Sequence, residues 1–246
     1  MAQTFRTSGI VLHRRSFRQV DKFVTIFTPS HGKLRLIAKG ALKIESKLAG
    51  HLEPFMQSDF LIARGKEWLR IAGVQVGEPF LEIRLDLQKI FLAARWCDRV
   101  DRLTRESAPD PWVYRLLEDA LKMLNTSDNL PADNEIRDLA FTMKLLTLIG
   151  VQPELQVCVV CRAVILEHDH EWSPRLGGLV HPAHVPQGVP TKPITSVDVR
   201  ALRFMQSETY MRAIQLRLPP GSRSDLSRLI ADWLEHHLEI SSFVSS

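Results

Sequence analysis

The chain is poor in cysteine, with three residues of this type in 246. Two of them, Cys158 and Cys161, are three positions apart, so the cysteines do not form the disulfide framework typical of small secreted domains. No stretch approaches the roughly 18 consecutive apolar residues that a transmembrane helix needs, and the first residues lack the apolar segment of a secretory signal. We therefore expect a soluble cytoplasmic protein and no membrane partner.

The short motifs of several large enzyme classes are also missing. The sequence has no Gly-x-x-x-x-Gly-Lys-Ser/Thr loop for nucleotide phosphates, no Gly-x-Ser-x-Gly nucleophile turn and no His-Glu-x-x-His zinc helix. Asp98, Asp101 and Glu106 follow the spacing of helical surface positions. This favours a solvated face over the rival interpretation, a metal-dependent nuclease or other hydrolase. We expect a protein that is not an enzyme.

Acidic residues are scarce at the start of the chain, where the first 50 residues contain two, Asp21 and Glu45. The same stretch contains ten cationic residues and carries a net charge of +8, whereas the whole chain carries +4. A concentrated cationic field attracts phosphate because binding releases condensed counterions. The pattern favours nucleic acid over an anionic membrane, an acidic protein or a merely solvated face. The candidate contacts are Arg14, Arg15, Arg18, Lys33, Arg35, Lys39, Lys43 and Lys47.

Five short runs rich in β-branched and aromatic residues, separated by polar turns, predict a small closed barrel of the OB type over residues 1–80. The runs are 8–16, 22–28, 33–38, 55–63 and 68–76. An SH3-like barrel or a small sandwich is the alternative. Four aromatic residues could stack on bases: Phe17, Phe23, Phe27 and Phe60. For each of them, packing in the core of the barrel is the preferred interpretation.

Helical periodicity replaces strand alternation after residue 80. Helices are expected over 85–104, 112–125, 134–149, 198–208 and 224–239, with Asp133 or Asn134 capping the third and Gly150 ending it. We expect a helical domain formed by 81–152 and 194–246, with the Gly-, Pro-, His- and Cys-rich segment 153–193 inserted between its two parts.

The inserted segment contains Cys158-Val-Val-Cys161 and, later, His181-Pro-Ala-His184. Two such pairs, each presented from a tight turn, suit one tetrahedral zinc ion, which with four protein ligands is structural. His168 and His170 offer competing nitrogens. The alternatives are idle cysteines with exposed histidines and, less favoured, a redox pair.

Several motifs of the first 75 residues resemble those of the RecO family of bacterial recombination mediators. They are Gly9-Ile-Val-Leu12, the run from Asp21 to Thr28, Gly32-Lys33, Ala38-Lys39-Gly40, Ser46-Lys47-Leu48, Gly50 and Leu52-Glu-Pro-Phe55. Their order and spacing match the family, and the later succession of helices, Cys/His segment and helices matches it more loosely. Two features depart from the family pattern: His181 and His184 replace the second cysteine pair typical of zinc-bearing relatives, and Leu42 replaces a frequent arginine.

The resemblance implies an α+β multidomain protein with an N-terminal OB fold, a helical domain and an inserted, zinc-ribbon-like segment. It implies a recombinational DNA repair mediator that binds single- and double-stranded DNA and anneals complementary strands. Such a mediator also helps to load recombinase onto DNA coated by single-stranded DNA-binding protein (SSB).

The implied partners are RecR and the C-terminal tail of SSB, and the implied location is the nucleoid. An acidic, hydrophobic tail suits an apolar groove rimmed by cations, for which Arg203 and Arg212 are candidates. The alternative function is that of an RNA-binding or ribosome-associated OB-fold protein, because charge alone does not separate DNA from RNA.

Overall fold

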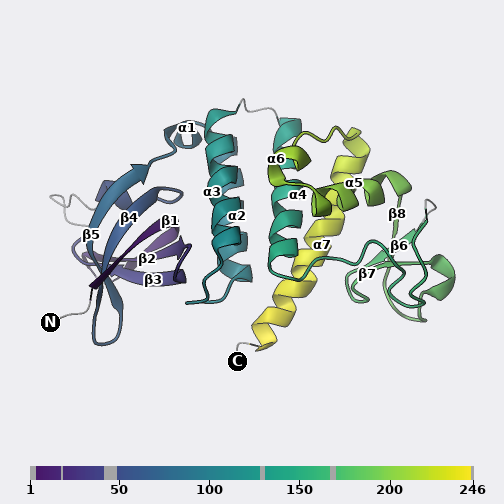
Figure 1. Ribbon diagram of the computed structural model, residues 1–246, viewed down its shortest axis with the longest axis horizontal. Coiled ribbons are helices and arrows are strands. Elements are labelled where there is room, and N and C mark those ends of the chain that lie inside the picture. Colours follow the sequence, from purple (N-terminus) through teal and green to yellow (C-terminus); the bar gives the residue numbers. More distant parts are fainter. Residues whose placement is uncertain (1–3, 18, 42–48, 128–130, 167–169, 245–246) are drawn as a thin grey trace. The chain divides into compact units, whose positions relative to one another are not determined.

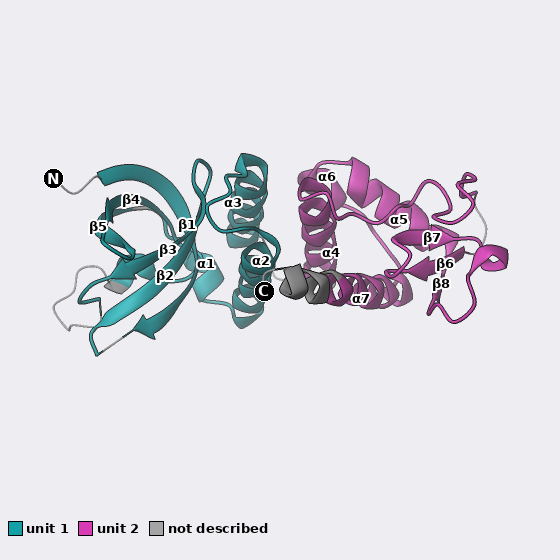
Figure 2. Ribbon diagram, turned by 90° about the horizontal axis from the view of Figure 1, so that it is seen from below, with its two compact units in different colours: residues 1–129 teal, residues 130–246 magenta. Residues whose placement is uncertain are grey.

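The structure, a computed structural model, describes residues 4–17, 19–41, 49–127, 131–166 and 170–244. At residues 76, 131, 132 and 237–244 it describes the backbone alone. The chain divides into two compact units, residues 1–129 and 130–246, which Figure 2 shows in different colours. Each unit buries its own set of apolar side chains.

The first unit begins with a closed barrel of five strands (Figure 1). The strands are β1 (Thr4–Phe17), β2 (Asp21–Thr28), β3 (Gly32–Ala38), β4 (Gln57–Arg64) and β5 (Leu69–Glu78). Their order is β1–β2–β3–β5–β4, and β4 pairs with β1 to close the ring. The β3–β5 pairing is parallel and the other four are antiparallel. The expected OB-type barrel is therefore confirmed.

Every second side chain along the strands points inward, and these side chains fill the barrel. Val24 and Ile26 on β2 and Leu36 on β3 are fully buried in its core, and a short 3-10 helix, η1 (Ala49–Leu52), adds Leu52. The residues between them point to the outer surface, because successive strand residues face opposite sides. Part of this outer surface is exposed to solvent, and part is covered by the helices that follow the barrel.

Helices α1 (Leu81–Arg84), α2 (Leu87–Leu103) and α3 (Pro111–Thr126) complete the first unit. The carboxylates of Asp86 and Asp110 cap α2 and α3 by accepting hydrogen bonds from backbone N–H groups of the first turn. Helix α2 packs on β1 and buries Trp96 and Val100. From α3, the Tyr114 hydroxyl is 3.1 Å from Gln57 Nε2, which donates to it.

The second unit combines helices with a small sheet. Its helices are α4 (Pro131–Leu148), α5 (Ser196–Ser207), α6 (Tyr210–Ala213) and α7 (Pro220–Val244). The strands β6 (His170–Ser173), β7 (Gly178–Val180) and β8 (Lys192–Ile194) form an antiparallel sheet in the order β7–β6–β8, and the 3-10 turn η2 (Pro182–His184) follows β7. Helix α4 contacts the other three helices.

Aromatic contacts and hydrogen bonds join the small sheet and the segment before it to the helices of the second unit. The ring of Trp172 on β6 packs against Trp233 on α7, with 5.2 Å between centroids. Trp233 Nε1 donates to the Val151 carbonyl at 2.9 Å. The Arg203 guanidinium of α5 donates to the carbonyls of Leu155 and Ile165. Arg203 is therefore engaged inside this unit, and it is not available as the rim cation that we considered for a partner's tail.

The boundary between the units, at residue 129, runs through the segment expected as the first part of one helical domain. Helices α2 and α3 belong with the barrel, and α4 belongs with the later helices. Helix α4 begins at Pro131, so the two expected caps, Asp133 and Asn134, lie inside the helix and the expected start was wrong. Gly150, with φ of 76°, ends the helix as expected. Among the helices that the structure describes, none is long and apolar enough to cross a membrane.

Candidate nucleic-acid interface and metal cluster

A β-bulge in β1 directs two basic side chains onto the outer surface of the barrel. Val11 is opposite Ile26 of β2, and both face the core. The pairing then shifts by one residue, and His13 is opposite Thr25 on the outer surface. Without the extra residue, His13 and Arg15 would follow Val11 into the core, because residues two apart share a face. The bulge was not predicted, since alternation alone does not reveal it.

We call the outward side chains His13, Arg15, Phe23, Thr25 and Arg35 the basic face. The register places Arg15 beside Phe23 and Arg35 beside Thr25, so three neighbouring strands contribute to it. The Arg15 guanidinium carbon lies 5.3 Å from the centroid of the Phe23 ring, within the range of a cation–π contact. Together with Asp101 of α2, these side chains line a pocket of about 240 Å³.

Two of the arginines predicted as nucleic-acid contacts, Arg35 and Arg14, differ in their neighbours. Arg35 Nε lies 3.6 Å from Glu106 Oε2, and both side chains are half exposed. Such a pair contributes little to stability and is open to exchange with a phosphate. Arg14 Nη2 lies 2.5 Å from Glu53 Oε2, and both groups are partly shielded from solvent. Arg35 is therefore the better placed of the two for a nucleic-acid contact.

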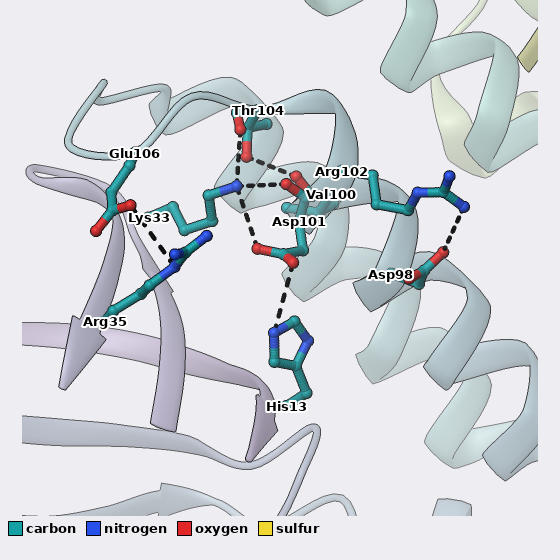
Figure 3. Close-up of polar contacts among 9 residues, drawn as sticks. All are labelled: His13, Lys33, Arg35, Asp98, Val100, Asp101, Arg102, Thr104 and Glu106. Carbon is teal, nitrogen blue, oxygen red and sulfur yellow. Dashed lines mark hydrogen bonds and ion pairs between the residues drawn. The ribbon is translucent and has the colours of Figure 1, made fainter. Parts of the chain in front are cut away.

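Lys33 is buried between β3 and α2 (Figure 3), with 6% of its surface exposed. Its Nζ donates to the backbone carbonyls of Asp101 and Thr104, the latter at 2.8 Å. The same atom lies 3.1 Å from the Asp101 carboxylate. Two hydrogen bonds and an ion pair thus engage the ammonium group inside the first unit, so Lys33 has the position of a structural residue and not that of an exposed phosphate contact.

Lys39 is exposed directly after β3. Because Ile37 of β3 pairs with Arg70 of β5, Arg70 lies at the same end of the barrel. Two more exposed cations follow: Arg64 is the last residue of β4, and Lys66 lies in the turn between β4 and β5. Arg64, Lys66 and Arg70 were not among the predicted contacts, although the density of cations over 64–70 was a signal for them. The predicted contacts Arg18, Lys43 and Lys47 lie outside the described residues.

Three aromatic rings, from the end of β1, from β2 and from the residue before β5, meet beside the basic face. The ring centroids of Phe17 and Phe23 are 4.1 Å apart, and Trp68 meets Phe23 edge-on at 5.2 Å. Trp68 is 45% exposed, which is unusual for so large an apolar side chain. We call Phe17, Phe23 and Trp68 the aromatic cluster. Phe27 and Phe60 are fully buried, as preferred for them, whereas Phe17 and Phe23 are only partly buried and lie outside the barrel core, so the preferred interpretation was wrong for these two.

The second unit brings together the predicted metal ligands Cys158, Cys161, His181 and His184. Their ligand atoms all lie within 4.8 Å of one another. Cys161 Sγ and His181 Nδ1 are 3.5 Å apart, close to the roughly 3.3–3.8 Å edge that zinc–ligand bond lengths give a tetrahedron. The residues therefore fit a four-coordinate metal.

The surroundings of the cluster favour its role as a ligand set. Burial alone would raise the pKa of the Cys158 thiol, but backbone N–H groups, including those of Cys161 and His181, donate to the sulfur and lower that pKa to about 6. A thiolate is the form that binds metal. The competing His170 is buried, and its Nε2 lies 2.6 Å from the Leu166 carbonyl. The other competitor, His168, lies outside the described residues.

Comparison with protein families accounts for nearly the whole chain. The family model described as Recombination protein O N terminal matches residues 1–80, and the model described as Recombination protein O C terminal matches residues 84–246. The chain belongs to the RecO family. The boundary at residue 80 coincides with the end of the OB-type barrel, so the first model corresponds to the barrel that presents the basic face.

Individual relatives in the RecO family match more than nine-tenths of the chain. The DNA repair protein RecO of Roseiflexus sp. (strain RS-1) is 31% identical over 237 residues, which are 96% of this chain and 82% of that protein. The protein of the same name from Desulforamulus reducens is 29% identical over 235 residues, covering 96% and 90%. That from Dehalococcoides mccartyi is 30% identical over 228 residues, covering 92% and 87%.

Proposed function

We propose that this chain is a recombinational DNA repair mediator that binds single- and double-stranded DNA through its barrel. It anneals complementary strands and helps to load recombinase onto SSB-coated single strands. Its membership in the RecO family and the names of its relatives support this role. The protein partners in this proposal are RecR and the C-terminal tail of SSB.

The observation that carries the proposal is the position of the basic face beside the aromatic cluster. In OB folds, the surface of strands 2 and 3 and the loops between strands 1–2 and 4–5 bind oligonucleotides. Here Arg35 lies on β3, Phe23 on β2 and Trp68 at the β4–β5 turn. Cations for phosphates and exposed rings for bases are the two components of a single-strand binding surface.

The mechanism that follows is electrostatic and non-catalytic. Arg15, Arg35 and Lys39 neutralise phosphates, which lowers the repulsion between two strands that share the surface. The Phe17, Phe23 and Trp68 rings stack with unpaired bases and keep a strand extended while its partner searches for the correct register. Neither step needs a bond to be made or broken in the DNA.

We further propose that zinc occupies the Cys158, Cys161, His181 and His184 cluster. With four protein ligands, the ion has no open position for water, so its contribution is to the stability of the second unit. Each ligand pair belongs to a separate turn, and a shared metal holds the two turns together. The DNA-binding surface in the first unit does not depend on this ion.

The test removes two charges and measures how binding depends on salt. The double variant Arg15→Gln/Lys39→Gln is expected to bind single-stranded DNA more weakly, with a slope of log affinity against log salt that is smaller by about 1.4. Arg115→Gln is the matched control, because this exposed arginine lies on α3 and pairs with Asp119. An unchanged slope in the double variant, or an equal loss in the control, contradicts the proposed surface.

A second measurement separates the proposal from its main rival. Competition with single-stranded RNA of the same sequence is expected to be no stronger than competition with DNA. Annealing of complementary, SSB-coated strands is expected to slow in the double variant and not in the control. A marked preference for RNA, together with an absence of annealing, would instead identify an RNA-binding protein.

A further inference from the structure

A carboxylate lies in the wall of the cationic pocket. Asp101 is on α2, and its side chain, 20% exposed, lines the pocket of about 240 Å³ with His13, Arg15, Phe23, Thr25 and Arg35. A negative charge at this position repels the phosphates that the surrounding cations attract. The pocket is therefore suited to a ligand that has a phosphate on one side and a hydrogen-bond donor on the other.

The orientation of this carboxylate is fixed from both sides (Figure 3). Asp101 Oδ1 lies 3.1 Å from Lys33 Nζ, which is itself buried and bound to backbone carbonyls. Asp101 Oδ2 lies 3.4 Å from His13 Nε2, and the His13 side chain is 48% exposed. Lys33 thus holds one oxygen in place, while the other is directed toward the half-exposed imidazole at the pocket wall.

We propose that this pocket reads the base of a bound nucleotide, with Asp101 Oδ2 accepting a hydrogen bond from an exocyclic amino group. The inference rests on the proposed binding of single-stranded DNA at the basic face. In this arrangement the base lies against the Phe23 ring. The Arg15 and Arg35 guanidiniums contact the backbone phosphates on either side of that nucleotide. The His13 side chain either rotates away from Asp101 Oδ2 or donates a hydrogen bond to the same nucleotide.

The chemistry of the bases determines which of them fit. Cytosine has an amino group at its 4-position, and carboxylates accept hydrogen bonds from that group. Uracil has a carbonyl oxygen at the same position, which a carboxylate repels. The two pyrimidines are otherwise alike in size and ring shape. The pocket therefore favours cytosine over uracil, and thymine resembles uracil at this position.

The experiment compares short oligo(dC) and oligo(dU) by fluorescence anisotropy with the full-length protein. The wild-type protein is expected to bind oligo(dC) about fivefold more tightly, the size of one net hydrogen bond. Asp101→Asn is expected to bring the ratio of the two dissociation constants close to one. Asp98→Asn is the control, because Asp98 lies one turn earlier on α2 and pairs with Arg102 on the exposed helix surface.

A probe that leaves the protein intact covers the case in which Asp101→Asn does not fold. Oligo(dC) with N4,N4-dimethylcytosine keeps the ring and loses both amino hydrogens. It is expected to bind the wild-type protein as weakly as oligo(dU). Equal affinities of the wild-type protein for oligo(dC) and oligo(dU), or a ratio that Asp101→Asn leaves unchanged, would overturn the inference.

The two proposals fail in different ways. If Arg15→Gln/Lys39→Gln leaves the affinity for both oligonucleotides unchanged, the basic face is not the DNA site, and the proposed function loses its support. If that variant weakens both equally and the wild-type protein does not distinguish them, DNA binds at the basic face and the base-reading role of Asp101 is wrong.

Discussion

The ammonium group of Lys33, on β3, lies 3.1 Å from the carboxylate of Asp101, on α2, inside the contact between the barrel and its covering helix. The same ammonium donates to two backbone carbonyls near the end of α2. The following loop adds a backbone bond, because Ser107 N donates to the Lys33 carbonyl at 2.9 Å. One residue of the barrel thus fixes both the end of α2 and the acid that lines the pocket.

Replacing Lys33 by methionine is expected to lower the free energy of unfolding of the first unit by about 2–4 kcal/mol. Methionine keeps much of the apolar stem but leaves a shielded carboxylate without its cation and two carbonyls without their donor. The measurement is urea denaturation followed by tryptophan fluorescence. Lys39→Met is the control, since Lys39 is exposed, and its unfolding free energy is expected to change by less than about 0.5 kcal/mol. A Lys33 variant of normal stability would show that the buried contacts are not needed.

Trp68→Ala is expected to weaken binding of single-stranded DNA by about 1–3 kcal/mol, because the exposed indole provides a stacking surface for one base. Binding of duplex DNA, whose bases are already stacked, is expected to change less. Trp112→Ala supplies the control, because Trp112 is 68% exposed and lies at the start of α3. If the two variants lose affinity equally, the aromatic cluster has no special role.

The contrast between Lys33 and Arg35 shows what alternation can and cannot predict. Both residues alternate with Leu34 and Leu36, so strand alternation places both on the outer face of the barrel. The strand is as predicted, and Leu34 and Leu36 lie in the core. The outer face is divided between solvent and α2, and this division depends on how a helix some 60 residues later packs, which strand periodicity does not contain.

Trp68 was missed for a related reason. Its position after the Gly65–Glu67 turn marks it as the start of a strand, and nothing local distinguishes it from a core residue. It meets Phe23 because β3 pairs in parallel with β5, bringing together segments about 45 residues apart. The metal cluster was easier to predict, since each pair of ligands lies within four consecutive residues and only one long-range contact had to be inferred.

Metal content is expected to follow the four predicted ligands. The purified protein is expected to contain about one zinc ion per chain, and Cys158→Ala or His181→Ala to contain almost none, because each loses one of four bonds. Cys97→Ala is the control, since Cys97 is buried in α2, where burial raises the pKa of its thiol. Elemental analysis gives the metal content directly.

Removal of the metal is expected to affect stability more than DNA binding. A chelator should lower the unfolding temperature of the second unit, because the ion joins the turn at Cys158–Cys161 to the one at His181–His184. Single-stranded DNA affinity, which depends on the barrel, should remain within about twofold. A large loss of DNA affinity on chelation would mean that the second unit, and not the basic face alone, binds the nucleic acid.

Gly32 is expected to tolerate no side chain. It begins β3 with φ of 66°, and a Cβ at this position would lie 2.1 Å from the Ala108 carbonyl oxygen. Gly32→Ala therefore combines a disfavoured backbone conformation with a collision against the loop that follows α2. We expect a loss of about 3 kcal/mol in the unfolding free energy of the first unit.

Gly150→Ala separates the cost of the backbone conformation from the cost of the collision. Gly150 has a similar φ of 76°, but no atom lies within 4 Å of a Cβ placed there. Its replacement is expected to cost the second unit about 1 kcal/mol, the conformational part alone. Equal losses in the two variants would indicate that the loop moves away from Gly32 without cost. A larger loss in Gly32→Ala would show that close packing of this loop on β3 holds α2, and with it Asp101, against the barrel.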